Sequence, residues 1–261
     1  RRQRQMCIRD RNYNKWWLKY YLWSIIAGLN GKSKIISASL ATEKKIIPLL
    51  KPKFIKTIYQ SAPQFDKLTD AKPYEKLDRQ PYILHVGVLE KRKNIGVLLK
   101  GFALFLKTFP DYNLVLVGQK GPTKDLDDYE NLQKLIHQLD LQTNVLFTGH
   151  AAANELKWLY ENASVYTFPS VNEGFGIPVL EAFSYGLPVI VSEDDAINEI
   201  AGNGALSVPS IDPRAWSEAM KKLINSSNLR DDLIKNGKIR LKEFSKKNFL
   251  EGIENYIFRD Q

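Results

Sequence analysis

Two glutamates, Glu173 and Glu181, stand eight residues apart in the segment EGFGIPVLEAFSYGLPVIVS and are the residues best suited to chemistry. Between them, Gly174 and Gly176 permit positive φ and a close approach of the backbone to a ligand. Pro178 suits the first helical position, so the spacing predicts that Glu181 lies in the first helical turn. Carboxylates beside free helix amides favour a ligand that carries phosphate and hydroxyl groups.

The elements around this pair must bring it to the edge of a sheet. Residues 165–170, VYTFPS, have the apolar pattern of a buried strand, and Gly186 with Pro188 ends the helix about two turns later. The pair therefore belongs to a strand, loop and helix whose amides face the carboxyl edge of a parallel sheet.

A basic turn, EKRK, forms a second candidate site. It lies between a predicted strand at 82–87 and an amphipathic helix from about 94 to 108. Arg92 and Lys93 in this position can clamp a pyrophosphate while the helix amides bind further oxygens. Lys120 follows the next predicted strand and is a second phosphate candidate.

Strands and helices alternate from about residue 81 to 225, which predicts an α/β fold with a doubly wound parallel sheet. Residues 226–261 are helical and charged in pattern. A chain of 261 residues with 44% apolar content has enough material for one to two domains.

The segment FPSVNEGFGIPVLEAFSYGLPVIVS resembles the donor-site signature of the retaining glycosyltransferases of family 4, which have the GT-B fold. The resemblance implies that Glu181 holds the ribose hydroxyls of a nucleotide sugar and that Glu173 contacts the transferred sugar. The loop residues that it implies as donor-binding, through their backbone amides, are Gly174, Phe175, Gly176 and Ile177.

The basic turn resembles the GxLExRKN loop of the same family, especially of its mannosyltransferase-like members. By this resemblance Arg92 and Lys93 stabilise the departing nucleoside diphosphate and join Glu173 as the catalytic residues. Many members carry an Arg after the strand-end glycine, where this chain has Val88, so the clamp rests on Arg92 and Lys93. The further donor-binding residues that we expect are Gly87, Val88, Lys120, Val145 and His150.

The GT-B resemblance also implies the domain organisation: one complete Rossmann-like donor-binding domain and the end of a second, truncated Rossmann-like domain. We expect an N-terminally truncated fragment. The expected parts are a non-native leader at 1–11, a remnant of the N-terminal acceptor-side domain at 12–62, a linker at 63–80, the C-terminal nucleotide-sugar-binding domain at 81–240, and a C-terminal helix at 241–261 that crosses back to the N-terminal domain.

Positive charge is concentrated at the start of the chain. Residues 1–60 hold 14 basic and 2 acidic residues, a balance of +12, which leaves −3 for the remainder. A predicted helix at about 12–27 is basic and rich in aromatic residues; it is either the core face of a domain or a contact with an anionic membrane surface. Its apolar stretch at 16–29 is too short to span a bilayer. We find no motif for reading nucleic acid and expect no such partner.

Cysteine and histidine usage indicates a reducing, cytoplasmic setting and no metal. The lone cysteine, Cys7, excludes a disulfide framework and a cysteine-based zinc site. The three histidines have no metal-binding spacing. His85 is expected within a strand as a core or strand-end residue, whereas His150 follows a strand at its carboxyl end and could line the nucleotide pocket.

The resemblance implies transfer of a hexose, with mannose favoured, from a nucleoside-diphosphate sugar to a hydroxyl acceptor with retention, in cell-surface polysaccharide or glycolipid synthesis. No cofactor is implied besides the donor substrate. The expected partners are the nucleotide sugar and a saccharide or lipid-linked acceptor, and the expected location is the cytoplasm or the inner face of the membrane. Two alternatives stay open: a non-catalytic nucleotide-sugar-binding fragment and a GT-B nucleotide-sugar epimerase.

Overall fold

The computed structural model describes residues 33–62, 70–74, 77 and 80–259. The expected leader at 1–11, the helix at about 12–27 and much of the expected linker lie outside these described residues.

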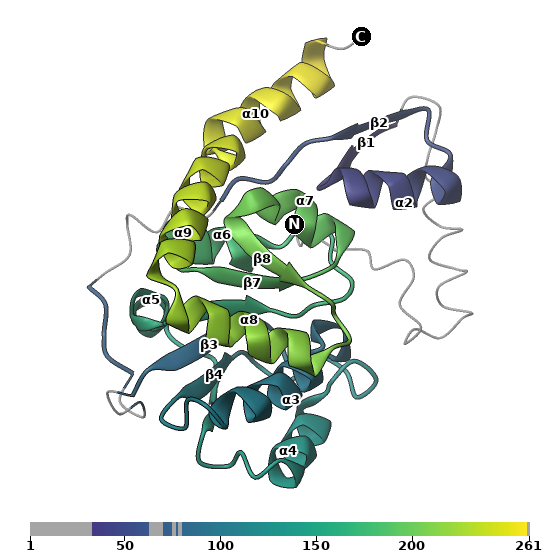
Figure 1. The fold of residues 1–261 in the computed structure, drawn as a ribbon. Helices are drawn as coiled ribbons and strands as arrows, with labels where there is room; N and C mark the ends of the chain where they lie inside the picture. The colour runs from purple at the N-terminus through teal and green to yellow at the C-terminus, as the bar shows by residue number, and fades with distance from the viewer. Residues whose placement is uncertain (1–32, 63–69, 75–76, 78–79, 260–261) are drawn as a thin grey trace.

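The described residues form an α/β structure (Figure 1). Its elements, in chain order, are β1 (Lys34–Ser37), α2 (Leu40–Leu50), β2 (Phe54–Thr57), β3 (Tyr82–Val86), the 3-10 turn η1 (Lys91–Lys93), α3 (Ile95–Leu106), β4 (Asn113–Val117), α4 (Tyr129–Gln138), β5 (Val145–Gly149), α5 (Ala153–Asn162), β6 (Val165–Phe168), α6 (Ile177–Ser184), β7 (Val189–Ser192), α7 (Asp195–Ala201), the 3-10 turn η2 (Gly202–Gly204), β8 (Ala205–Val208), α8 (Pro213–Asn225), α9 (Ser227–Leu241), the 3-10 turn η3 (Lys242–Phe244), α10 (Lys246–Glu254) and the π-helical turn η4 (Asn255–Arg259).

The main sheet has six parallel strands in the order β5-β4-β3-β6-β7-β8. Its inner strands are predominantly apolar and buried, because a parallel sheet buries both of its faces under helices. The strands predicted at 82–87 and 165–170 are confirmed as β3 and β6, with ends within two residues of the expected positions.

Alternation along the strands divides the core into two layers. Ile83 and Leu114 point to the face covered by α3, α4 and α8, while Leu84 and Val115 point to the face covered by α5, α6 and α7. α3 and α8 pack closely at Gly101, where a β-carbon would lie 2.8 Å from the β-carbon of Trp216. The sheet is thus doubly wound, as its sequence pattern predicts.

Residues 33–62 form a small unit in which β1 and β2 pair in parallel and flank α2. Ser39 caps α2, its hydroxyl accepting a hydrogen bond from the amide of Thr42 at 3.1 Å. The C-terminal helices α9 and α10 run from the main sheet toward this unit (Figure 1). The ammonium of Lys34 in β1 donates to the carbonyl of Tyr256 at 2.7 Å, so the chain end lies against β1.

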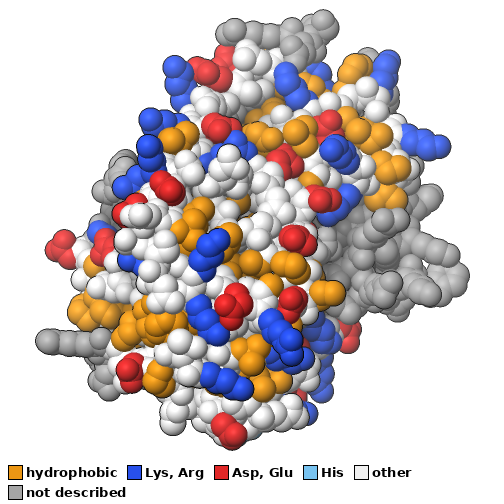
Figure 2. All heavy atoms as spheres, viewed as in Figure 1, with side chains coloured by type: hydrophobic (Ala, Val, Ile, Leu, Met, Phe, Trp, Pro, Cys, Tyr) orange, Lys and Arg blue, Asp and Glu red, His pale blue; other side chains and the backbone are white. Residues whose placement is uncertain are grey.

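Basic and acidic side chains are interspersed on the face of the molecule shown in Figure 2, rather than gathered into a patch of one sign. Within the described ranges, none of the helices has both the length and the apolar content needed to cross a membrane.

Candidate active site

The candidate site lies at the carboxyl edge of the six-stranded sheet, where the strand order reverses. β3 pairs with β4 on one side and with β6 on the other, and the chain winds outward from each in opposite directions. Ligands of doubly wound sheets bind at such a switch point. The loops that follow β3 and β6, at 87–94 and 169–176, carry the predicted catalytic residues.

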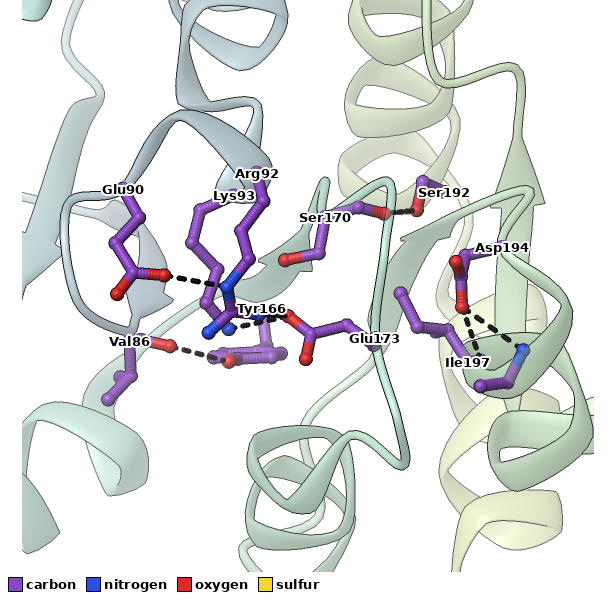
Figure 3. A network of polar contacts seen from close by, with 11 residues as sticks. Val86, Glu90, Arg92, Lys93, Tyr166, Ser170, Glu173, Ser192, Asp194 and Ile197 are labelled. Atoms are coloured by element: carbon purple, nitrogen blue, oxygen red, sulfur yellow. Dashed lines mark hydrogen bonds and ion pairs between the residues drawn. The ribbon is translucent and has the colours of Figure 1, made fainter. Parts of the chain in front are cut away.

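Arg92 and Lys93 reach across from η1 to one carboxylate oxygen of Glu173 (Figure 3). The Nη1 of Arg92 lies 2.8 Å from Glu173 Oε1, and the Nζ of Lys93 lies 2.6 Å from the same oxygen. The Nε of Arg92 also donates to Glu90 Oε2 at 2.6 Å. The structure therefore unites the three predicted catalytic residues, which are 80 and 81 positions apart in the sequence.

Burial and charge act in opposite directions on Glu173. Burial favours the neutral acid, but the ammonium of Lys93 and the guanidinium of Arg92 outweigh it and hold the pKa of this carboxyl below its usual value. Lys93 and Glu173 are only 7% and 8% exposed. With Glu90 included, two cations and two carboxylates form a locally neutral, largely buried cluster.

Backbone contacts hold the two loops against each other. The amide of Val171 donates to the carbonyl of Arg92 at 3.0 Å. Asn94 has a left-handed conformation, with φ 52°, and links η1 to α3. Its side-chain amide donates to the carbonyls of Pro169 and Ser210, so the basic turn is tied to the segments that follow β6 and β8.

Glu181 lies on α6 and is partly buried. The helix begins at Ile177 with Gly176 as its N-cap, so Glu181 is its fifth residue. The prediction that Glu181 lies in the first turn is therefore wrong by one residue, because the helix starts before Pro178 rather than at it. Burial raises the pKa of Glu181, and a hydrogen bond from Tyr160 partly offsets this effect.

Tyr160 on α5 donates its hydroxyl to Glu181 Oε2 at 2.8 Å. Its ring stacks on Tyr185 with a centroid distance of 5.1 Å and an interplanar angle of 5°. The centroid of the Tyr160 ring lies 5.8 Å from that of Tyr166. Glu181 is thus surrounded by tyrosines, whereas Glu173 is surrounded by cations.

The loop after β6 is also held by the small N-terminal unit. The hydroxyls of Ser39 and Thr42 donate to the carbonyl oxygen of Gly174 at 2.8 and 3.1 Å. Glu199 on α7 accepts hydrogen bonds from the amides of Leu40 and Ala41 at the start of α2, at 2.7 and 2.8 Å. We name these contacts the α2 interlock.

Phe175 and Gly176 complete the loop in different ways. The Phe175 side chain is 1% exposed and lies against Tyr59 and Phe244, with ring centroids 6.3 and 5.7 Å away. Gly176 has φ 107°, which a residue with a side chain rarely adopts, and it turns the chain into α6. Phe175 therefore anchors the loop in the core, and its ring is unavailable to a ligand.

The end of β3 is shaped by a contact between two glycines. A β-carbon at Gly118 would lie 1.9 Å from the carbonyl oxygen of Gly87, so only glycine fits at position 118. Val88 follows at the surface with 38% exposure. Gly87 and Val88 thus lie at the carboxyl edge beside the basic turn, as predicted.

The remaining predicted residues lie in different environments. The ammonium of Lys120 lies over the ring of Tyr129, 4.2 Å from its centroid. His150 is exposed after the carboxyl end of β5. Val145 begins β5 and lies about 13 Å from that end, at the opposite edge of the sheet. A ligand at the carboxyl edge would therefore meet Gly149 and His150 rather than Val145.

His85 is a core residue of β3, in agreement with its position in the strand. Its Nδ1 lies 3.0 Å from the carbonyl oxygen of Thr167, which fixes the proton on this nitrogen. Burial lowers the pKa of His85 to about 4, despite that hydrogen bond. Within the ranges that the structure describes, no group of three His, Cys, Asp or Glu side chains is placed to hold a metal ion. The metal-free expectation stays a prediction.

Tyr160, Ser39, Thr42 and Glu199 were not among the predicted site residues. Their contacts join positions that are 21 to 159 residues apart, and no spacing in the sequence indicates them. A buried tyrosine within a helix, such as Tyr160, has the pattern of an ordinary core residue.

Comparisons relate this chain to known proteins. The family model described as glycosyl transferases group 1 matches residues 66–240. O-antigen chain mannosyltransferase RfbU of Salmonella typhimurium is 34% identical over 170 residues, which cover 65% of this chain and 44% of the relative. O-antigen chain mannosyltransferase B of Escherichia coli is 31% identical over 170 residues, 65% of this chain and 43% of the relative. The chain thus spans less than half the length of these two relatives.

Among solved structures, HepE of Anabaena in complex with UDP and glucose superposes with a TM-score of 0.77 at 17% identity. The match covers 94% of this chain and 69% of that one. At this identity the likeness concerns the fold alone, and it confirms the expected α/β architecture of GT-B type.

Proposed function

Because the chain belongs to the glycosyl transferases group 1 family, we propose that its protein transfers a hexose from a nucleoside-diphosphate sugar to a hydroxyl group of an acceptor. The observation that carries this proposal is the convergence of Arg92, Lys93 and Glu173 at the switch point of the sheet. Two cations held at a carboxyl edge are suited to a diphosphate, and an adjacent carboxylate is suited to sugar hydroxyls.

The difficult step in such a transfer is the departure of the leaving group. Negative charge accumulates on the diphosphate as the bond to the anomeric carbon breaks. Arg92 and Lys93 are fixed before the reaction by Glu173 and the loop contacts, so they can stabilise that charge with little rearrangement. Since these cations supply the positive charge, we propose that no metal ion is required.

The two glutamates have separate roles in this proposal. Glu181, at the second turn of α6, accepts hydrogen bonds from the ribose hydroxyls. Glu173 contacts the transferred sugar, and the amides of the loop 174–176 contact the sugar and the diphosphate.

We further propose mannose as the sugar, with retention at the anomeric carbon and a saccharide or lipid-linked acceptor in cell-surface polysaccharide synthesis. The names of the two O-antigen mannosyltransferase relatives support the sugar and the product class. A location at the cytoplasmic side of the membrane is compatible with such an acceptor. The family match favours transfer over the epimerase alternative.

Isothermal titration of this chain with UDP, GDP, UDP-glucose and GDP-mannose tests the proposal. We expect a nucleoside diphosphate to bind with an affinity that weakens as salt is added, because the contact is ionic. GDP-mannose should bind more tightly than UDP-glucose if mannose is the sugar. No binding of any of the four up to millimolar concentration would contradict the donor site.

A further inference from the structure

We propose that Tyr160 is a positioning residue for nucleotide binding: its hydroxyl holds one oxygen of Glu181 in place and directs the other oxygen toward the ribose hydroxyls. The inference rests on the ribose-binding role of Glu181 proposed above. It adds a residue from a different helix, α5, to the donor site.

The geometry of Tyr160 is that of a fixed donor. The side chain is fully buried, and its hydroxyl lies 2.8 Å from Glu181 Oε2. Tyr185 stacks parallel to the ring at 5.1 Å, and Tyr166 packs beside it at 5.8 Å. A ring packed in this way cannot swing, so the hydroxyl defines where Oε2 lies.

The carboxylate of Glu181 has more acceptor capacity than this one bond uses. An ionised carboxylate offers about four lone-pair positions on two oxygens. Among the side chains that the structure describes, Tyr160 is the one that donates to this carboxylate. As far as the described residues go, Oε1 is therefore open to a ligand, and it can accept hydrogen bonds from adjacent ribose hydroxyls.

The tyrosines that face Glu181 do not change charge in the pH range in which Glu181 titrates. They include Tyr160 on α5, Tyr166 on β6 and Tyr185 after α6, and the pKa of each tyrosine is raised, first of all by burial. These tyrosines stay neutral through the range in which a carboxyl group titrates. Glu161 on α5 interacts electrostatically with Tyr185, Lys238 on α9 lies beside Gly186, and Glu199 on α7 is engaged with the start of α2.

Removal of the Tyr160 hydroxyl should therefore change the pH dependence of binding. Burial raises the pKa of Glu181, and the Tyr160 hydrogen bond acts against that rise. In Tyr160→Phe the opposing effect is lost, so Glu181 becomes protonated at a higher pH than in the wild type. Since the ionised carboxylate is the better acceptor for ribose hydroxyls, nucleotide affinity should begin to fall at a higher pH.

The experiment titrates wild type and Tyr160→Phe with the tighter-binding of UDP and GDP from pH 5 to pH 8. We expect about a tenfold weaker affinity at neutral pH. We also expect the acid-side fall in affinity to move to higher pH. The titration of the nucleotide's own phosphate is common to both proteins and cancels in the comparison. With the 2′,3′-dideoxy form of the same nucleotide, the two proteins should bind equally.

Tyr82→Phe is the matched control. Tyr82 is also buried, and its hydroxyl donates to the carbonyl of Leu159, the residue before Tyr160, at the same distance of 2.8 Å. This variant removes an equivalent hydroxyl that also contacts α5, and it should bind nucleotide like the wild type. Equal losses in the two variants would show that Tyr160 only supports α5 and would overturn the proposal.

A second variant keeps the inference testable if Tyr160→Phe folds poorly. In Glu181→Gln the ribonucleotide and its dideoxy form should lose affinity in parallel as the pH falls, because no carboxyl group titrates at this position. If the ribonucleotide still loses more affinity than its dideoxy form, Glu181 is not the titrating group and the proposal is wrong. Normal affinity of Tyr160→Phe at every pH would also overturn it. Failure of the wild type to bind either nucleotide would instead contradict the donor site itself.

Discussion

Glu173 and Glu181 belong to one short motif, the first buried and the second partly buried, and they have opposite electrostatic environments. Glu173 faces Arg92 and Lys93, which hold its pKa down against burial, whereas Glu181 faces tyrosine rings and its pKa is raised. The difference comes from the elements packed against each: the turn after β3 for one, and α5 for the other. A motif fixes residue types, and the tertiary neighbours decide what each carboxyl group can do.

The largest expected difference between the two glutamates concerns stability. Glu173→Gln leaves the buried ammonium of Lys93 without its counter-charge and should lower the free energy of unfolding by about 3 kcal/mol at neutral pH. Glu181→Gln removes a charge that burial disfavours and should be neutral or slightly stabilising. Urea denaturation of both variants measures this contrast, and equal losses would contradict it.

The same contrast has a pH dependence. Because the folded state lowers the pKa of Glu173 below its ordinary value of 4.5, its contribution to stability is present above that pH. It is lost as the pH falls through the folded value, so wild type and Glu173→Gln should converge in acid. For Glu181 the sign is reversed: its pKa is raised, so its ionised form lowers the stability, and this loss disappears as the pH falls.

The next largest effect should be on turnover. Lys93→Ala should lower kcat on the order of 100-fold, with a smaller change in KM, because the diphosphate gains charge only as the bond to the sugar breaks. Lys91→Ala is the control in the same turn, since the Lys91 ammonium donates to the carbonyl of Asp125. A variant that keeps kcat and only raises KM would show that Lys93 holds the donor without assisting departure.

Nucleotide affinity should depend on Glu181 more than on Glu173, which is the reverse of the order expected for stability. Glu181→Ala should weaken binding of a nucleoside diphosphate by about 1.5 to 3 kcal/mol, the value of a charge-assisted hydrogen bond. Glu173→Ala should bind the nucleotide no more weakly, because its contact is with the sugar and its removal frees two cations. Isothermal titration with UDP and GDP measures both, and equal losses would end this division of roles.

The smallest effect should come from Ser39. Ser39→Ala removes the cap of α2 and one bond to the Gly174 carbonyl and should cost about 1 kcal/mol of stability. Because Gly174 adjoins Glu173 rather than Glu181, affinity for a nucleotide sugar should fall while affinity for the free nucleotide stays. Ser226→Ala, which removes the cap of α9 away from the site, is the control. An equal fall for both ligands would mean that the loop acts as one rigid body.

The sequence predicted the strands and the two site loops, because continuous apolar runs and glycine-rich turns are local signals. It placed Arg92 and Lys93 near Glu173 only by the family resemblance, since Lys93 and Glu173 are 80 positions apart and the sequence between them does not indicate that contact. Tyr160 was missed for a related reason. Whether a buried tyrosine faces a carboxylate depends on how α5 packs against α6, which periodicity does not encode.

The α2 interlock sets a condition for engineering the donor loop. Four hydrogen bonds join the start of α2 to Gly174 and Glu199, so residues 169–176 are shaped partly by a segment that lies more than a hundred positions earlier. A loop grafted from a relative to alter sugar preference would arrive without its matching serine, threonine and glutamate. Transplantation should therefore succeed when Ser39, Thr42 and Glu199 are exchanged together with the loop, as one portable module.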